Sequence, residues 1–348
     1  MYTINGFWHG ASTLSGRIDL SQALATYGRL IESCSDLQLR EQQVHPRHLR
    51  TLRETEPLSC SQQSLLLGQP GFPPSLAPIP YAPPVLFYLG NIDLLTEPCV
   101  AIVGARKCTQ RGIDMARSLA QGLTNAGLVV VSGLAYGIDT AAHFASPERT
   151  VAVLGQGLEQ ALRSRKQKHM KRIVDQGGLV LSEFPPWMPA SRYTFPQRNR
   201  IISGLCEGTI VVEATMRSGS KITARQALEQ GRELMVIPGH PTDKNSEGCN
   251  AMLMDGAALI RNAEDALQCL GRELSQKEKR LPSCPEQSKI ISALRTGDTF
   301  DHIVQQTNMR HSQISIALAT LELSGWIRRL PGDRLAIDDD VRSHSPAP

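Results

Sequence analysis

The sequence predicts an α/β protein whose core is a Rossmann-like, doubly wound, mainly parallel sheet. From residue 99 onward, short apolar runs alternate with amphipathic helical stretches, and each run is typical of a strand buried on both faces. This alternation indicates a parallel sheet with helices on both sides. The runs read CVAIVGA, LVVVSGLA, TVAVLG, GLVLSEF, GTIVVEA and ELMVIPG. We assign this core to residues 98–270.

A small helical domain is expected ahead of the core, over residues 1–66. Within it, Leu20, Leu24, Tyr27 and Ile31 recur at intervals of three and four, which predicts a helix over 20–34.

Residues 67–97 are rich in proline and glycine, which disfavours regular structure. The stretch nevertheless carries too much apolar surface to leave in water. We therefore predict a packed connector. Its large apolar side chains are Phe72, Leu76, Tyr81, Leu86, Phe87 and Tyr88.

The C-terminal part predicts a second fold. Residues 271–287 are polar and are expected to form a linker. Residues 288–338 show three helical segments and then two short strands joined at PGDR, which is the order of a winged helix-turn-helix. Residues 339–348 are expected to be a disordered tail.

Composition bounds the function without deciding it. The 348 residues allow about two to three domains, and a net charge of +4 is too small to indicate a nucleic-acid binder by itself. Eight scattered cysteines without a C-x-x-C pair predict reduced thiols rather than a zinc site. The absence of a signal peptide and of an 18-residue apolar run predicts a cytoplasmic protein with no membrane partner.

The first strand-following loop, GARKCTQRG, combines glycine with several cations. In parallel sheets ligands lie beyond the carboxyl ends of the strands, where loop amides and helix N-termini can approach a phosphate. Gly104 ends the strand, Arg106 and Lys107 follow, and Arg111 stands at the helix entrance. A tight turn with surface charges is the alternative interpretation.

The second loop, SGLAYGIDTAAH, supplies backbone turns at Gly133 and Gly137. Asp139 is expected to cap the following helix. We interpret His143 as a structural histidine of that helix rather than a catalytic one.

The segment GSKITARQALEQG places Gly219 and Ser220 before a helix and Lys221 in its first turn. A lysine there opposes the helix dipole, which costs up to about 1 kcal/mol unless an anion compensates. This misfit favours a phosphate ligand.

The segment FPQRNRIISG predicts a cationic loop ahead of a helix that begins at the two isoleucines. Arg198, Asn199 and Arg200 are expected to face the same sheet edge as Arg106 and Lys221. A solvated loop is the alternative. Tyr193 and Phe195 would contact bases only if their rings are exposed.

The run RSRKQKHMKR, residues 163–172, holds six Lys/Arg and no acid. A solvated helix face and a contact with a polyanion both remain open for it.

Catalytic signatures are missing. The sequence has no nucleophile elbow, no H-E-x-x-H and no acidic cluster suited to magnesium, and Glu183, Glu213 and Glu229 lack partners in sequence. We therefore predict no catalytic residue, metal or cofactor.

Taken together, the loops resemble the DNA processing protein A family, DprA or Smf. The matching segments read VAIVGARKCTQRG, VVSGLAYGIDTAAH, VAVLGQGLE, GGLVLSEFPPWMPASRYTFPQRNRIISGL, VVEATMRSGSKITARQALEQGRELMVIPG and SEGCNAMLMDGAALI. The resemblance implies a non-enzymatic homodimer that binds single-stranded DNA, protects incoming DNA in natural transformation and helps load the recombinase RecA, with SSB as a further partner. It also implies a SAM-like N-terminal domain and a winged-helix-like C-terminal domain.

The resemblance carries DNA contacts onto matching positions alone. These are Gly104, Ala105, Arg106, Lys107, Ser132, Gly133, Arg198, Asn199, Arg200, Gly219, Ser220 and Lys221. The chain departs from the family where it reads G-A-R instead of G-S-R, and where EQALRSRKQ replaces a tyrosine-proline motif after Leu158, so no contact is transferred there. The N-terminal domain lacks the family's helix-hairpin-helix glycines.

Two alternatives belong to other classes. A phosphoribohydrolase-like, nucleotide-processing enzyme has a similar core, but its P-G-G-x-G-T-x-x-E segment is absent here. A winged-helix transcription regulator is the other alternative, although its expected recognition helix has only Arg310 and His311 near its start.

Overall fold

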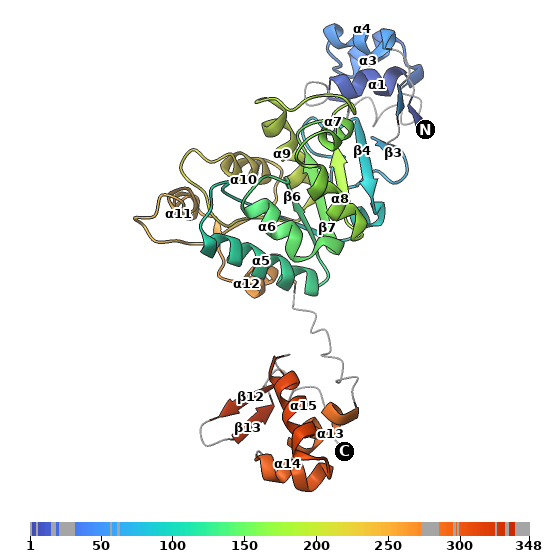
Figure 1. Cartoon of the computed structure of the whole chain (residues 1–348). Coiled ribbons are helices and arrows are strands. Elements are labelled where there is room, and N and C mark those ends of the chain that lie inside the picture. Colours follow the sequence, from blue (N-terminus) through green and yellow to red (C-terminus); the bar gives the residue numbers. More distant parts are fainter. Residues whose placement is uncertain are drawn as a thin grey trace. The chain divides into compact units, whose positions relative to one another are not determined.

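The computed structural model describes residues 2–4, 6–14, 19–20, 32–55, 58–60, 63–272, 285–294, 297, 299–323, 326–330 and 334–337. It divides into two units, residues 1–274 and 275–348, which we describe separately (Figure 1). Most of the helix predicted over 20–34, residues 273–284 of the predicted linker and the whole predicted tail lie outside the described residues.

A nine-stranded sheet organises the described part of the first unit. Its strand order is β11-β10-β9-β5-β6-β7-β8-β4-β3. The strands from β11 to β8 pair in parallel, and β4 and β3 add two antiparallel strands beyond β8. The strands are β3 (Gln63–Leu66), β4 (Val85–Gly90), β5 (Cys99–Val103), β6 (Val129–Ser132), β7 (Thr150–Leu154), β8 (Leu179–Ser182), β9 (Gly208–Val211), β10 (Glu233–Val236) and β11 (Ala258–Leu259). The predicted Rossmann-like class is confirmed.

Helices cover both faces of this sheet. They are α5 (Gln110–Asn125), α6 (Ile138–Ala145), α7 (Leu158–Leu162), α8 (Gln167–Asp175), α9 (Thr194–Leu205), α10 (Ser220–Glu229), α11 (Glu247–Met254) and α12 (Ala263–Cys269), with 3-10 turns η2 (Ile92–Thr96) and η3 (Pro147–Arg149). Val130 packs with α5, α6 and α12, whereas Val129 and Val131 belong to the cluster that contains α9. Successive strand residues point to opposite faces, so α9 lies across the sheet from α5.

The sheet begins earlier than the range 98–270 that the sequence predicted. Strands β3 and β4 precede residue 98, and β4 pairs with β8 from Phe87 opposite Ser182 to Gly90 opposite Leu179. The prolines of the connector lie between these two strands, so VLFYLG is free to supply the backbone donors of a strand.

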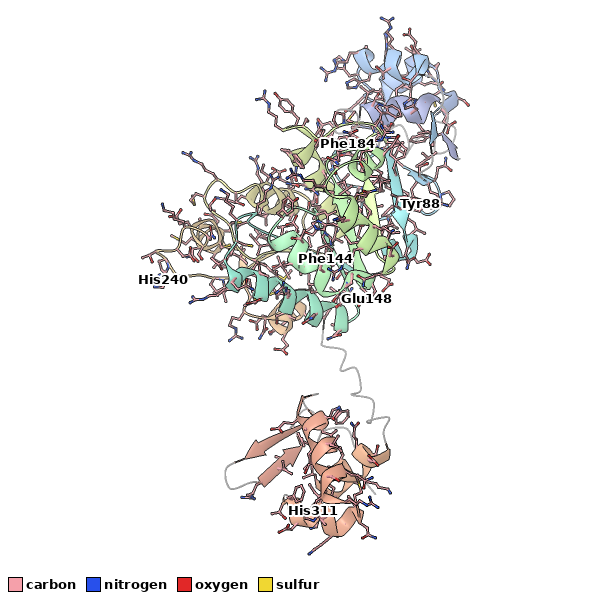
Figure 2. The ribbon with its side chains drawn as sticks, in the orientation of Figure 1. Tyr88, Phe144, Glu148, Phe184, His240 and His311 are labelled. Atoms are coloured by element: carbon pink, nitrogen blue, oxygen red, sulfur yellow. The ribbon has the colours of Figure 1, made fainter. Side chains whose placement is uncertain are left out.

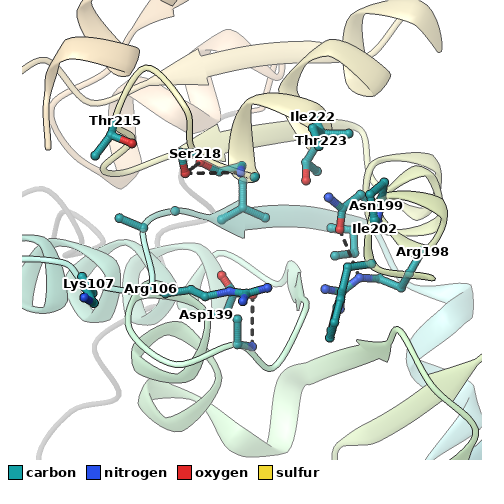
Figure 3. A pocket seen from close by; sticks show the side chains of 18 of the residues that line it. Arg106, Lys107, Asp139, Arg198, Asn199, Ile202, Thr215, Ser218, Ile222 and Thr223 are labelled. Carbon is teal, nitrogen blue, oxygen red and sulfur yellow. Dashed lines mark hydrogen bonds between the residues drawn. The ribbon is translucent and has the colours of Figure 1, made fainter. Parts of the chain in front are cut away.

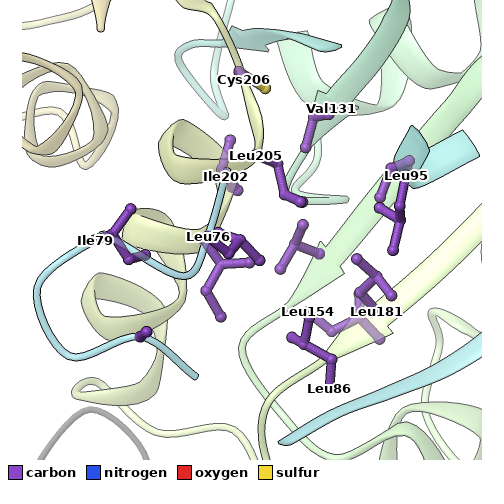
Figure 4. Close-up of a cluster of buried hydrophobic side chains, with 14 of the residues drawn as sticks. Leu76, Ile79, Leu86, Leu95, Val131, Leu154, Leu181, Ile202, Leu205 and Cys206 are labelled. Carbon is purple, nitrogen blue, oxygen red and sulfur yellow. The ribbon is translucent and has the colours of Figure 1, made fainter. Parts of the chain in front are cut away.

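The connector between β3 and β4 packs against α9. Leu76 and Ile79 are buried, and a Cβ added at Gly204 of α9 would meet their side chains at 2.8 and 3.0 Å. Figure 4 shows Leu76 beside Ile202 and Leu205 of that helix. Helix α9 is therefore held between the connector and the sheet.

The N-terminal part contains the helices α1 (Gly6–Thr13), α3 (Asp36–Glu41) and α4 (Pro46–Glu54), with an antiparallel pair of β1 (Tyr2–Ile4) and β2 (Leu58–Cys60). Ser35 and Gln38 form a capping box that starts α3. Trp8, Leu39 and Leu52 are among its fully buried side chains.

The second unit has the predicted winged-helix order. Helices α13 (Pro285–Leu294), α14 (Phe300–Thr307) and α15 (His311–Leu323) precede an antiparallel pair of β12 (Ile327–Leu330) and β13 (Arg334–Ile337). Asn308 ends α14 with a left-handed backbone at φ 53°. Ile290, Ile314 and Leu318 are buried in this unit's own core.

In the parts of the chain that the structure describes, no helix combines the length and apolar character needed to cross a membrane.

Candidate functional site

A cavity of about 690 Å³ lies at the carboxyl edge of the sheet (Figure 3). It is formed by the loops that follow β5, β6, β8, β9 and β10 and by the start of α9. Its lining residues are Val103, Gly104, Ala105, Arg106, Lys107, Ala135, Asp139, Arg192, Phe195, Pro196, Arg198, Asn199, Ile202, Thr215, Ser218, Gly219, Ser220, Ile222, Thr223, Lys244 and Asn245.

The cavity is strongly cationic. Arg106, Lys107, Arg192, Arg198 and Lys244 line it against a single lining carboxylate, that of Asp139. Figure 3 shows the Arg106 and Arg198 side chains extending toward each other from opposite sides of the cavity. An excess of positive charge in a recess raises the local concentration of anions.

The segment FPQRNRIISG is wholly helical, so the prediction of a cationic loop is wrong. Helix α9 already begins at Thr194. The hydroxyl of Ser191 accepts hydrogen bonds from the amides of Tyr193 and Thr194, which caps the helix start. Pro196 lies in the first turn, where a missing amide proton costs no helical hydrogen bond.

Arg198 is an anchor of the cavity wall. Its side chain is 4% exposed and donates to the carbonyl oxygens of Gly133, at 2.8 Å, and Val153. It also donates to the side-chain oxygen of Asn199 at 3.1 Å. Burial, together with the neighbouring Arg106, lowers the pKa of Arg198 to about 10. The carboxylates of Asp139 and Glu183 act in the opposite direction and raise this pKa.

Arg200 does not line the cavity, which corrects its predicted place beside Arg106. Its guanidinium forms a two-pronged ion pair with Glu183, with nitrogen–oxygen distances of 2.9 and 2.6 Å. Both partners are buried, and Arg200 also donates to the carbonyl of Tyr81 in the connector at 3.0 Å. Arg198 and Arg200 have different partners because their side chains point about 200° apart around the axis of α9.

Ser132 and Gly133 lie behind the cavity lining. Ser132 is fully buried and donates to the carbonyl of Ile102 at 2.6 Å. The Gly133 amide donates to Asp139 at 3.1 Å while its carbonyl accepts from Arg198. Gly133 thus contacts two residues of the lining through its backbone, whereas Ser132 bonds to the neighbouring strand β5 through its hydroxyl.

Asp139 is not the helix cap that the sequence predicted, because α6 begins at Ile138 with Gly137 at its N-cap. Its carboxylate instead accepts from the amides of Gly133 and Ala135 at 3.1 and 3.3 Å. Burial raises the pKa of Asp139, whereas Arg198 and the two amides act in the opposite direction.

His143 is the structural histidine that we predicted. It is fully buried and its Nδ1 lies 2.6 Å from the hydroxyl of Thr150. Burial lowers its pKa to about 3, which leaves the ring neutral.

Glu213 forms hydrogen bonds to Thr109 and Asn245, two partners that could not be predicted from the sequence. Its carboxylate accepts from the amide and hydroxyl of Thr109, at 2.9 and 2.5 Å, and from the amide group of Asn245 at 3.4 Å. Glu213 thereby holds the loop after β5 to the loop after β10.

Helix α10 begins at the cavity, which Gly219 and Ser220 line. Lys221 lies in the first turn but is not a lining residue. The sequence did not single out Arg192, Lys244 or Asn245, although each belongs to a strand-following loop.

Phe195 bridges two cations. Arg106 lies 5.4 Å and Lys166 lies 5.9 Å from the centre of its ring. Phe195 is half-buried, whereas Tyr193 beside it is 60% exposed and is stacked by Arg192 at 4.7 Å. Lys166 comes from the basic run, for which the sequence leaves a solvated helix face and a contact with a polyanion both open.

Lys166 predicts a measurable pH effect on stability. Burial, followed by Arg198, lowers its pKa from 10.5 to about 8. The unfolded chain then binds more protons between these pH values, so the penalty from Lys166 is full below pH 8 and is lost as the pH rises toward 10.5. We expect the free energy of unfolding of the wild type to rise relative to that of Lys166→Met over this interval, by at most about 1.4 kcal/mol per pH unit. Urea titrations at several pH values measure this difference. If the free energies of unfolding of the wild type and the variant changed equally with pH, the lowered pKa of Lys166 would be contradicted.

The close packing of Gly133 against Arg198 predicts that a larger residue at position 133 lowers stability. A Cβ at this position would lie 2.5 Å from both terminal nitrogens of Arg198, so Gly133→Ala must displace the guanidinium. We expect a loss of about 1–3 kcal/mol in the free energy of unfolding. Gly219→Ala is the matched control, because no atom lies within 4 Å of its added Cβ. Equal unfolding midpoints for the two variants would contradict the packing of Arg198.

Among the described residues, no three His, Cys, Asp or Glu side chains gather in a way that could hold a metal ion. Glu229, the acid considered for nucleotide hydrolysis, is half exposed and pairs with Arg225 at 2.8 Å. It lies about 13 Å along α10 from Ser220 and away from the cavity lining.

Family models match both units of the chain. The model described as DNA recombination-mediator protein A matches residues 63–271, and the model described as DprA winged helix domain matches residues 278–333. The chain belongs to the DNA processing protein A family. The first match starts at β3, in agreement with the beginning of the sheet.

Relatives of the DprA family extend the similarity along most of the chain. Protein Smf of Escherichia coli is 36% identical over 281 residues, which are 75% of this chain and 74% of that protein. DNA processing protein DprA of Streptococcus pneumoniae is 46% identical over 199 residues, or 56% of this chain and 70% of that one.

Two solved DprA structures share the fold. The X-ray structure from Streptococcus pneumoniae has a TM-score of 0.60 and 37% identity, and it covers 76% of this chain and 98% of that one. The structure of DprA from Helicobacter pylori, which concerns its single-stranded DNA binding mode, has a TM-score of 0.55 and 28% identity, and it covers 60% of this chain and 95% of that one.

Proposed function

We propose that this chain binds single-stranded DNA in the cationic cavity and has no catalytic activity. The observation that carries the proposal is the cavity lining, which holds five cationic side chains and one buried carboxylate. The N-terminus of helix α10 also lies at this cavity. The single-stranded DNA binding mode of the Helicobacter pylori relative supports the same ligand. Phosphates are the groups that such a lining would bind.

The proposed contacts are a subset of the twelve predicted positions. They are Gly104, Ala105, Arg106, Lys107, Arg198, Asn199, Gly219 and Ser220, joined by Arg192 and Lys244. Ser132, Gly133 and Arg200 support the site from behind, and Lys221 would approach the strand only outside the lining. Tyr193, which is 60% exposed, is available for stacking on a base.

Binding of labelled oligo-dT at several salt concentrations tests this function. We expect the logarithm of the association constant to fall linearly with the logarithm of salt concentration, with a slope of about −0.7 for each phosphate contacted. Equally tight binding of duplex DNA, or affinity independent of salt, would contradict the proposal.

The two alternative functions receive less support from the site. A phosphoribohydrolase needs an acid near the bound nucleotide, whereas Glu229 lies at the far end of α10. Release of free base from AMP that Glu229→Gln abolishes would restore that alternative. A transcription regulator would need phosphate contacts, and helix α15 contains no lysine or arginine.

We further propose that the protein acts in the cytoplasm as a homodimer that protects incoming DNA and loads RecA onto SSB-coated strands. Met254 and Leu259 are 89% and 53% exposed, and these two apolar side chains suit an interface between copies. Accelerated growth of RecA filaments on SSB-coated single strands is the expected result. A wild-type protein that is monomeric in sedimentation, or inactive with RecA while binding DNA, would confine the function to DNA protection.

A further inference from the structure

The basic run at residues 163–172 divides into three groups in the structure. Arg163 pairs with Glu159 at 2.5 Å, and Arg172 stacks on Phe144 at 4.4 Å. Lys166 turns inward toward the cavity, where it contacts Phe195. The remaining cations, Arg165, Lys168 and Lys171, are exposed and belong to none of the ion pairs formed by the described residues.

Helix α8 presents these cations to solvent because its other side is apolar. Met170 and Ile173 are buried beneath it, whereas Lys168 and Lys171 stand one helical turn apart on the exposed side. No carboxylate occurs between Glu159 and Asp175 in the sequence. The first two turns of α8 therefore carry positive charge that no acidic residue of the same segment balances.

Aromatic rings accompany this charge. The ring of His169 lies 5.2 Å from Phe144 and 6.2 Å from Tyr136, with interplanar angles of 71° and 79°. Phe144, which Figure 2 labels on α6, is half-buried, whereas Tyr136 is 61% exposed. The row of rings thus ends in Tyr136, whose side chain is largely exposed to solvent.

This surface is continuous with the cavity. Tyr136 directly follows Ala135, a lining residue, and Lys166 contacts Phe195, another lining residue. The sheet order agrees, because β7, the strand before the basic run, lies between β6 and β8, whose following loops both contribute lining residues. A strand that leaves the cavity along the carboxyl edge therefore reaches α8.

We propose that the bound single strand continues from the cavity over the start of α8, where Arg165, Lys168 and Lys171 contact its phosphates and Tyr136 stacks on a base. This extension rests on the proposed function of the cavity. Exposed rings among cations suit a single strand rather than a duplex, because the bases of a duplex are already stacked on one another.

Two lengths of oligo-dT separate the extension from the cavity. An oligonucleotide of about 6 nucleotides would occupy the cavity alone, and one of about 15 would also reach α8. We expect Lys168→Ala/Lys171→Ala to bind the short one as the wild type does. For the long one, we expect weaker binding and a salt slope that is less steep by about 0.7 for each phosphate that the variant no longer neutralises.

Arg40→Ala/Lys289→Ala is the matched control, since it removes two exposed cations far along the chain from the basic run. Its affinity for both lengths should equal that of the wild type after the same change in net charge. A comparable loss of affinity in this control would mean that net charge alone acts, and would overturn the extension.

Tyr136 supplies an independent measurement. Tyr136→Ala should weaken binding of the long oligonucleotide by at least about 5-fold, and Tyr136→Phe should restore it because the ring is kept. Unchanged affinity in Tyr136→Ala and in Lys168→Ala/Lys171→Ala would overturn the extension while short-strand binding still supports the cavity. If the wild type binds neither length, the proposed function itself fails.

Discussion

Arg200→Ala is expected to lower the free energy of unfolding by about 3–5 kcal/mol, because it removes the ion-pair partner of the buried carboxylate of Glu183. The variant also loses the hydrogen bond from Arg200 to the connector at Tyr81. Urea-induced unfolding measures this decrease in stability. The folded fraction should still bind oligo-dT with nearly wild-type affinity, because Arg200 does not line the cavity.

A double variant provides the control for Arg200. Replacing both partners, as in Glu183→Met/Arg200→Met, removes both charges and should recover part of the stability lost in Arg200→Ala. If Arg200→Ala were as stable as the wild type but bound DNA at least tenfold more weakly, Arg200 would be a DNA contact and our assignment of a structural role would be wrong.

Arg106→Glu is expected to lower the affinity for oligo-dT by about 10- to 100-fold at low salt. Arg106 is exposed, lines the cavity and extends toward Arg198 across it. The change therefore replaces a proposed phosphate contact with a side chain that has the same sign of charge as phosphate. It also removes one cation from the ring of Phe195. Fluorescence anisotropy with labelled oligo-dT measures the effect.

The matched control for Arg106 is Arg40→Glu, which changes the net charge equally at an exposed position on α3. Its affinity should stay within about 2-fold of the wild type, since a distant charge is screened beyond about 10 Å at 0.1 M salt. Thermal unfolding of both variants should be close to that of the wild type. An equal decrease in DNA affinity in both variants would remove the support for a specific site.

The central sheet could be predicted from the sequence because its parallel strands are buried on both faces and read as continuous apolar runs. Strands β5, β6 and β7 are fully buried, as their sequences indicated. Strand β4 was assigned to the connector instead, because nearby prolines dominated the local signal. Its place depends on pairing with β8, which lies about 90 residues later.

The cationic edge was predicted in outline but not residue by residue. Arg106, Arg198 and Arg200 have the same chemistry in sequence, and only the fold distributes them among the cavity rim, the cavity wall and an ion pair. Glu183, the ion-pair partner of Arg200, directly follows strand β8. The three arginines differ in their burial and in partners that are distant in sequence, and local sequence patterns contain neither.

Removing the segment before residue 98 would create an aggregation problem. Strand β8 would lose β4 as its neighbour and become the sheet's outermost strand, with unpaired backbone groups and a largely apolar sequence. Such edges recruit other chains. Gly204 of α9, which packs against Leu76 and Ile79 of the connector, would be uncovered as well. A fragment of the core should therefore retain β4 and the residues of the connector that pack on α9.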